Sequence, residues 1–122
     1  MKLNVIDEDF SVCKVTDLSQ VDFKDEFLFM GKTDEELSLV CRTGAVPGNA
    51  VCREDGWSAF RVEGQLDFSL IGILSGISSV LAEEKIGIFV VSTYNTDYVL
   101  VHKDDLERGI GALENKGYEV GR

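Results

Sequence analysis

The second half of the chain alternates short β-like runs with stretches whose apolar residues recur at helical spacing. Residues 57–62, WSAFRV, are typical of a strand, and a helix is predicted from about residues 67–69 to residue 85. Its apolar stripe consists of Leu70, Ile73, Leu74, Ile77 and Leu81. The glycines Gly72 and Gly76 weaken an isolated helix by roughly 1 kcal/mol each relative to Ala. We therefore expect another segment to pack closely against this helix.

A hairpin follows this helix. Residues 86–92, IGIFVVS, are apolar and rich in β-branched side chains, which is typical of a strand covered on both faces. Residues 97–102, DYVLVH, predict the strand that pairs with it. The connection STYNTD, residues 92–97, is polar, contains no glycine and is longer than a tight turn requires.

A second helix and a short strand close the chain. Within residues 103–117, Asp104 and Glu107 have N-cap and N3 spacing, and Gly117 stands where a C-terminal cap belongs. Residues 118–120, YEV, predict the last strand. The order is βαββαβ, the ferredoxin-like arrangement of the α+β class, in which two helices cover one face of a four-stranded antiparallel sheet.

The first half repeats this order in reduced form. Residues 10–15, FSVCKV, match WSAFRV, and residues 27–42 match the later hairpin if two inserted residues are allowed. Residues 16–26 are too short and too acidic to replace the first helix. Because residues 44–56, the one linker-like stretch, are short and contain apolar residues, we expect the halves to pack together. The sequence predicts a degenerate first unit, residues 1–53, and a complete second unit, residues 54–122.

Charge and composition exclude several classes of partner. The formal net charge is −10, with 22 Asp and Glu against 12 Lys and Arg, and neither half offers a basic face. Nucleic acids and anionic membranes bind clustered Lys and Arg, so we expect neither as a partner. No apolar run reaches the roughly 18 residues of a membrane span, and the first residues do not resemble a secretion signal. These features predict a cytoplasmic protein.

The residue types that carry catalysis or bind metals are sparse. Cys13, Cys41 and Cys52 are widely spaced and form no CxxC pair, and we do not expect the fold to bring them together with His102, the only histidine, as a zinc site. No GxSxG motif and no serine near a histidine in sequence is present. We therefore expect reduced, structural thiols, no metal, no cofactor and no enzymatic activity.

Four segments of the second half, taken in order, resemble the ACT-domain family. The likeness is specifically to small bacterial tandem-ACT proteins related to aspartate-kinase regulatory domains and to the animal cytosolic arginine sensor of the mTOR pathway. The segments are WSAFRVEG, LDFSLIG, STYNTDYVLV and KDDLERGIGAL. They cover most of residues 54–120, and TDEELSLV extends the likeness into the first half.

The resemblance implies a module that binds an amino acid or a similar small ligand between two ACT units and regulates a partner enzyme or complex. In the arginine-sensor relatives, the pocket is lined by a loop that matches residues 66–70 and by a hairpin segment that matches Thr93, Tyr94, Thr96 and Asp97. That relative carries an acidic residue where this chain has Leu70, so arginine specificity is not implied.

The chemistry of the residues agrees with an amino-acid ligand. Free backbone N–H groups near the start of the first helix, residues 68–72, suit a carboxylate, and Asp97 suits an ammonium. Carbonyl groups of residues 93–95 can share the ammonium, while Tyr94 or Phe68 can contact the ligand side chain. The candidate ligand-binding residues are Leu66, Asp67, Phe68, Ser69, Leu70, Gly72, Ser92, Thr93, Tyr94, Asn95, Thr96 and Asp97.

Simpler interpretations of the same residues stay open. The STYNTD connection has the composition of an ordinary polar loop. Asp67 is also a common helix-capping residue, and Gly72 also suits a position of close helix packing. The hypothesis is a non-catalytic amino-acid sensor, and the apolar strand 86–91 favours a homodimer. The alternative is a constitutive protein-interaction module with a vestigial pocket.

Overall fold

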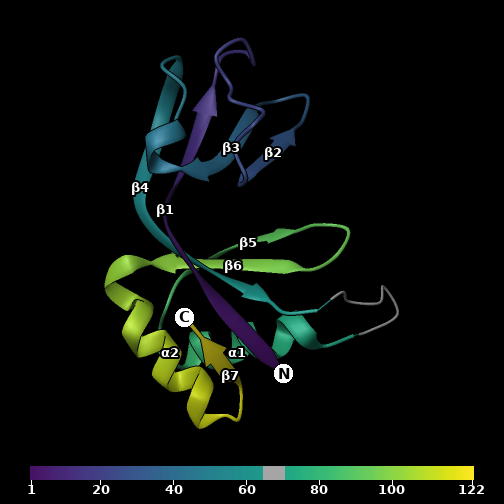
Figure 1. The fold of residues 1–122 in the computed structure, drawn as a ribbon, viewed down its shortest axis with the longest axis vertical. Helices are drawn as coiled ribbons and strands as arrows, with labels where there is room; N and C mark the ends of the chain where they lie inside the picture. Colours follow the sequence, from purple (N-terminus) through teal and green to yellow (C-terminus); the bar gives the residue numbers. More distant parts are fainter. Residues whose placement is uncertain (65–70) are drawn as a thin grey trace. The chain divides into compact units, whose positions relative to one another are not determined.

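A computed structural model describes residues 1–64 and 71–122 of the chain (Figure 1). The elements of the described residues follow in the order β1 (Lys2–Val15), β2 (Leu28–Lys32), β3 (Leu37–Arg42), the 3₁₀ helix η1 (Thr43–Ala45), β4 (Ala50–Val62), α1 (Ile73–Glu83), β5 (Ile88–Ser92), β6 (Asp97–His102), the 3₁₀ helix η2 (Lys103–Asp105), α2 (Leu106–Asn115) and β7 (Glu119–Gly121).

The chain divides into two compact units that share two strands. The larger unit contains Met1–Asp7 and Ser58–Arg122, and the smaller unit contains Glu8–Trp57. The strands β1 and β4 each contribute residues to both units.

The strand order of the larger unit is β7-β1-β4-β6-β5. β5 and β6 are antiparallel, with Ser92 opposite Asp97, whereas β7 pairs with β1 in parallel, with Lys2 opposite Glu119. The sequence pattern predicted four antiparallel strands and gave no clear signal for residues 2–9 of β1. That prediction is wrong at β7, because the first residues of the chain lie between β7 and β4.

The two helices of the larger unit lie on one face of its strands, as predicted (Figure 1). Both contribute to the same core, into which the strands direct alternate side chains. The buried members from strands include Leu3, Phe60, Val62, Val99 and Val101, and those from helices include Ile77, Leu81, Ile110 and Leu113. The edge strand β5 is only half-buried, so its predicted coverage on both faces is not supplied by the described residues.

The helix α1 begins later than predicted. Its N-cap is Gly72, whose φ of +81° is a left-handed conformation that a continuous right-handed helix does not permit. The helix predicted from residues 67–69 onward is therefore not continuous through Gly72, and Asp67, its predicted cap, lies outside the described residues. Gly76 confirms the predicted close packing, because a β-carbon at this position would lie 2.8 Å from the Tyr118 hydroxyl oxygen.

The ends of α2 agree only in part with the sequence. Asp104 lies in η2 and is not the N-cap, which is Asp105 without a side-chain cap bond. The Asp105 carboxylate instead accepts a hydrogen bond from Arg108 at 2.8 Å. At the other end, Gly117 has a φ of +93° and its N–H donates to the Glu114 carbonyl at 3.0 Å, which confirms the predicted C-terminal cap.

The smaller unit has the strand order β2-β3-β1-β4. One core cluster of this unit contains the buried residues Cys13, Val15, Leu39 and Cys41. No helix is assigned between β1 and β2, where the sequence predicted none. Aspartate side chains stabilise local turns in this segment. The Asp17 carboxylate accepts a hydrogen bond from the Ser19 N–H, and the Asp22 carboxylate accepts one from the Lys24 N–H, both at 3.0 Å. β4 begins at Ala50, so the linker-like stretch 44–56 ends as a strand.

The β2–β3 and β5–β6 hairpins have the same dimensions. Each joins a five-residue strand to a six-residue strand through four residues, and each is followed by a three-residue 3₁₀ helix. Lys32 lies opposite Leu37 in one hairpin and Ser92 opposite Asp97 in the other. The predicted two-residue insertion is therefore wrong, because Thr33 corresponds to Thr93 with no gap.

Candidate ligand-binding site

The β5–β6 turn, residues 92–97, is a closed and largely exposed loop. The Thr93 N–H donates to the Thr96 carbonyl at 2.8 Å, and the Thr93 hydroxyl donates to the same oxygen at 3.0 Å. Tyr94 is 74% exposed, and Asn95 is also exposed. The turn therefore presents an aromatic ring and polar groups to solvent from a backbone that is held by its own hydrogen bonds.

Asp97 is oriented by a neighbour across the turn. The Ser92 hydroxyl donates to Asp97 Oδ1 at 2.6 Å, and Asp97 is half-buried. A hydrogen bond to a carboxylate is stronger than one between neutral groups, so it holds the side chain in one orientation. Among the described residues, no hydrogen bond engages Asp97 Oδ2, which is suited to accept a bond from an ammonium.

Thr96 ties the turn to another strand. It is only 8% exposed, and its hydroxyl donates to the carbonyl of Val62 at 2.7 Å. Val62 is the last residue of β4, and the chain turns soon after it at Gly64, whose φ is +88°. Figure 1 shows the β5–β6 turn and this end of β4 on the same side of the larger unit. The structure thus brings the turn to the start of the β4–α1 connection.

Gly72 lies in different surroundings. The Gly76 N–H donates to the Gly72 carbonyl at 2.9 Å, so the N–H groups of residues 73–75 have no acceptor within α1. Of residues 68–72, whose N–H groups were predicted to bind a carboxylate, residues 68–70 lie outside the described residues. A cavity of about 330 Å³ adjoins this helix start. It is lined by Met1, Ile71, Gly72, Ile73, Lys116, Gly117 and Tyr118. No residue of the β5–β6 turn lines this cavity.

The predicted loop residues lie outside the described residues. They are Leu66, Asp67, Phe68, Ser69 and Leu70. Of the remaining predicted residues, the structure brings Ser92, Thr93, Thr96 and Asp97 together through hydrogen bonds, and Tyr94 and Asn95 project from the same turn. Gly72 is the one described residue of the predicted site that lies outside this turn.

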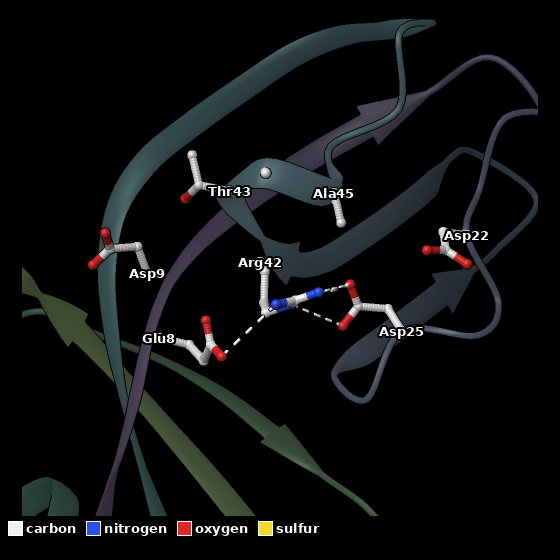
Figure 2. Close-up of a pocket in the computed structure, with 8 residues that line it drawn as sticks. Glu8, Asp9, Asp22, Asp25, Arg42, Thr43 and Ala45 are labelled. Atoms are coloured by element: carbon white, nitrogen blue, oxygen red, sulfur yellow. Dashed lines mark hydrogen bonds and ion pairs between the residues drawn. The ribbon is translucent and has the colours of Figure 1, made fainter.

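A second cavity, of about 390 Å³, lies in the smaller unit and was not predicted (Figure 2). It is lined by Glu8, Asp9, Asp22, Asp25, Arg42, Thr43, Gly44 and Ala45. Figure 2 shows Arg42 between Glu8 and Asp25. These carboxylates are far apart in sequence, so no local pattern signals the cluster.

The guanidinium of Arg42 is largely engaged by Asp25. Nε donates to Oδ1 at 3.0 Å and Nη2 to Oδ2 at 2.8 Å, while Nη1 lies 3.8 Å from Glu8. The Asp25 side chain is 2% exposed, and the hydrogen bonds from Arg42 hold the pKa of its carboxyl below the usual value. This ion pair fixes the loop before β2 to the end of β3, which is a structural role.

The cysteines are free, as predicted. Cys13 and Cys41 are buried and Cys52 is exposed. Burial raises the pKa of the Cys41 thiol to about 12, and it also raises the pKa of Cys13. Protonated thiols are poor nucleophiles, so these two residues act as core side chains.

Metal-ligand clusters and membrane-spanning helices are both absent from the described residues. Within residues 1–64 and 71–122, no group of three or more His, Cys, Asp or Glu side chains is placed to hold a metal ion. In the same part of the chain, each helix is too short or too polar to cross a membrane.

Comparisons with known proteins place most of these elements in one family. A family model described as the ACT domain matches residues 53–115, a range that includes the β5–β6 turn. No match was found among curated proteins. A crystal structure of an Agobacterium tumefaciens protein is 32% identical, with a TM-score of 0.86, over 98% of this chain and 90% of that one.

Two aspartate kinase structures have the same fold. The allosteric aspartate kinase of Clostridium acetobutylicum is 17% identical, with a TM-score of 0.66, over 93% of this chain and 34% of that one. The regulatory subunit of aspartate kinase from Thermus thermophilus, in its ligand-free form, is 7% identical, with a TM-score of 0.66, over 93% of this chain and 95% of that one. At these identities the likeness concerns the fold alone.

Proposed function

The chain belongs to the ACT domain family, and from this premise we propose that it is a regulatory module that binds an amino acid at the β5–β6 turn and acts on a partner protein without catalysis. ACT domains are generally small-molecule-binding regulatory modules. The observation that carries the proposal is the Asp97 carboxylate, which Ser92 holds at 2.6 Å in an accessible turn within the matched range.

The turn supplies the groups that an ammonium needs. Asp97 Oδ2 accepts one charge-assisted hydrogen bond, and the carbonyl groups of residues 93–95 accept others. Tyr94, which is 74% exposed, provides an aromatic surface for the ligand's side chain. An ammonium that leaves water loses its hydration, so these acceptors must replace it.

The tandem organisation is part of the same proposal. The smaller unit is a degenerate ACT-like unit, since its hairpin and 3₁₀ helix repeat the lengths found in the larger unit and it lacks the first helix. At the positions of Ser92 and Asp97 it carries Lys32 and Leu37, so its turn lacks the carboxylate that binds the ligand.

A second copy of the chain is the proposed partner at β5. This edge strand has four apolar, half-buried residues and no charged side chain, which leaves it unprotected against pairing. The same observation supports the alternative, a constitutive interaction module. Light scattering with and without amino acids separates them, because a sensor changes its association on binding and a constitutive module does not.

Ligand screening tests the proposed function. Calorimetry and thermal unfolding are measured with each common amino acid, and a ligand at 100 times its dissociation constant adds roughly 2.7 kcal/mol of stability. Asp97→Ala is expected to abolish the stabilisation, whereas Asp34→Ala in the other hairpin's turn is the matched control and keeps it. If no amino acid binds, or if Asp97→Ala binds as tightly as wild type, the proposal fails.

A further inference from the structure

Thr96 is an unusual residue for a hairpin turn. Ser92, Thr93, Tyr94 and Asn95 before it are all exposed, yet Thr96 is 8% exposed. Among the described residues of the larger unit, Ser58 and Thr96 are the buried polar side chains. A buried hydroxyl is costly unless it is hydrogen-bonded, so the partner of Thr96 explains why it is buried.

The partner is distant in sequence. The Thr96 hydroxyl donates at 2.7 Å to the carbonyl of Val62, which precedes it by 34 residues and is 1% exposed. The Thr96 carbonyl meanwhile accepts both donors of Thr93. Thr96 therefore has two separate connections, one that closes the turn and one that joins the turn to the end of β4.

The corresponding turn of the smaller unit shows that closing a loop of this length does not need the second connection. Glu36 occupies the position of Thr96 and is exposed. The Thr33 N–H donates to the Glu36 carbonyl at 3.0 Å, and the Thr33 hydroxyl accepts the Glu35 and Glu36 N–H groups at 3.1 and 3.2 Å. The Thr96–Val62 bond consequently has a role other than forming the turn.

We infer that Thr96 is a positioning residue for ligand binding, which holds the β5–β6 turn against the end of β4 so that Asp97 meets the ligand's ammonium in a fixed place. The inference rests on the proposed function. Asp97 follows Thr96 directly, and Ser92 fixes the Asp97 carboxylate relative to the turn, so the hydroxyl fixes the turn and carboxylate relative to β4. Val62 is the last residue of β4, so the same bond holds the turn beside the start of the β4–α1 connection, where the chain bends at Gly64.

The variants for the test differ by single groups. Thr96→Val keeps the shape of the side chain and removes the hydroxyl, whereas Thr96→Ser keeps the hydroxyl and removes a methyl group. Thr33→Val is the control for hydroxyl loss in a turn of the same length. Calorimetry measures the affinity for the amino acid that stabilises wild type, and hydrogen exchange of the Thr93 and Thr96 amides measures the mobility of the turn.

Thr96→Val is expected to weaken the affinity about tenfold and to accelerate exchange in the turn while circular dichroism stays native. Thr96→Ser is expected to restore affinity to within about threefold of wild type, which a loss of packing alone does not allow. Thr33→Val is expected to bind as wild type. Equal affinity of wild type and Thr96→Val, or no recovery in Thr96→Ser, overturns the inference and leaves the proposed function standing. A wild-type protein that binds no amino acid overturns both.

Discussion

The β2–β3 and β5–β6 hairpins share one backbone plan and differ in what holds them. Both turns close through the N–H of a threonine, Thr33 or Thr93, and the carbonyl three residues later. The β2–β3 turn is otherwise stabilised by its own Thr33 hydroxyl and is acidic and exposed. The β5–β6 turn adds a carboxylate oriented by Ser92 and a bond to β4. The backbone geometry of these turns is therefore separable from the chemistry that would serve a ligand.

The support behind each hairpin also differs. β5 and β6 pack against the core shared with α1 and α2, whereas β2 and β3 pack against a cluster that includes two thiols and residues of connecting loops. Helices resist the collapse of a cavity more than loops do, so equivalent substitutions should have unequal effects.

Core truncation should give the largest effects. Leu81→Ala in α1 removes a fully buried side chain, and we expect it to lower the free energy of unfolding by about 2–5 kcal/mol. Leu39→Ala, at 1% exposure in β3, should lie at the low end of that range because adjacent loops can move into the space. Urea unfolding followed by circular dichroism measures both, with Ile71→Ala at a 91% exposed site as the control. Equal losses of unfolding free energy in Leu81→Ala and Leu39→Ala would contradict the proposed difference between the two cores.

Swapping the equivalent turn residues Thr96 and Glu36 should give the next largest effect on the free energy of unfolding. Thr96→Glu introduces a charge at a buried site and removes the donor to Val62, so we expect a loss of about 1–3 kcal/mol of unfolding free energy. The reverse exchange, Glu36→Thr, changes an exposed residue and should stay within about 0.5 kcal/mol of wild type. Thermal and urea unfolding of both variants test the asymmetry, which would be refuted by similar losses.

The shared closing threonines should have smaller and similar effects. Thr33→Ala removes the acceptor of two backbone N–H groups, and Thr93→Ala removes one donor to the Thr96 carbonyl. Each should cost about 0.5–1.5 kcal/mol of unfolding free energy. Urea unfolding measures both. A much larger loss at Thr93 would mean that the turns are not equivalent even in how they close.

The smallest effect at neutral pH should come from the Arg42–Asp25 pair, because the Arg42 side chain is 43% exposed. The pKa of Asp25 is lowered in the folded protein, chiefly by its hydrogen bond from Arg42. Its contribution to stability is therefore complete above the unfolded-state pKa, about 3.9, and is lost as the pH falls below it through the folded pKa. Arg42→Met should flatten that acid dependence in thermal unfolding from pH 7 to 3. Arg108→Met, the control in α2, should leave it unchanged.

Local patterns predicted the elements whose signals are contiguous in sequence. β6 spans Asp97–His102, as predicted from alternating residues, and α2 ends where Gly117 can adopt a positive φ. The ACT resemblance inferred from four segments is confirmed by the family match over residues 53–115. The start of α1 was not predicted because the sequence does not distinguish two roles of glycine. Gly72 precedes the helix with a left-handed φ, whereas Gly76 lies inside the helix and permits close packing.

The rest depends on contacts that no local pattern contains. Leu3 and Val5 alternate as a strand should, but the acidic residues 7–9 that follow them obscure the pattern. The bond from Thr96 to Val62 joins residues 34 positions apart, and the Arg42 cluster gathers carboxylates from separate segments. The loop half of the predicted site, residues 66–70, lies outside the described residues and stays a prediction.

The parallel pairing of β1 with β7 has a consequence for the order of folding during synthesis. Lys2 lies opposite Glu119, so the N-terminal end of β1 can pair with β7 only after Glu119 has been translated, on the order of ten seconds after Lys2 at typical rates. Contacts so far apart in sequence also slow folding by their loop-closure entropy. During that interval the N-terminal segment has an unpaired strand edge, which exposes the nascent chain to aggregation at an edge that β7 covers in the folded protein.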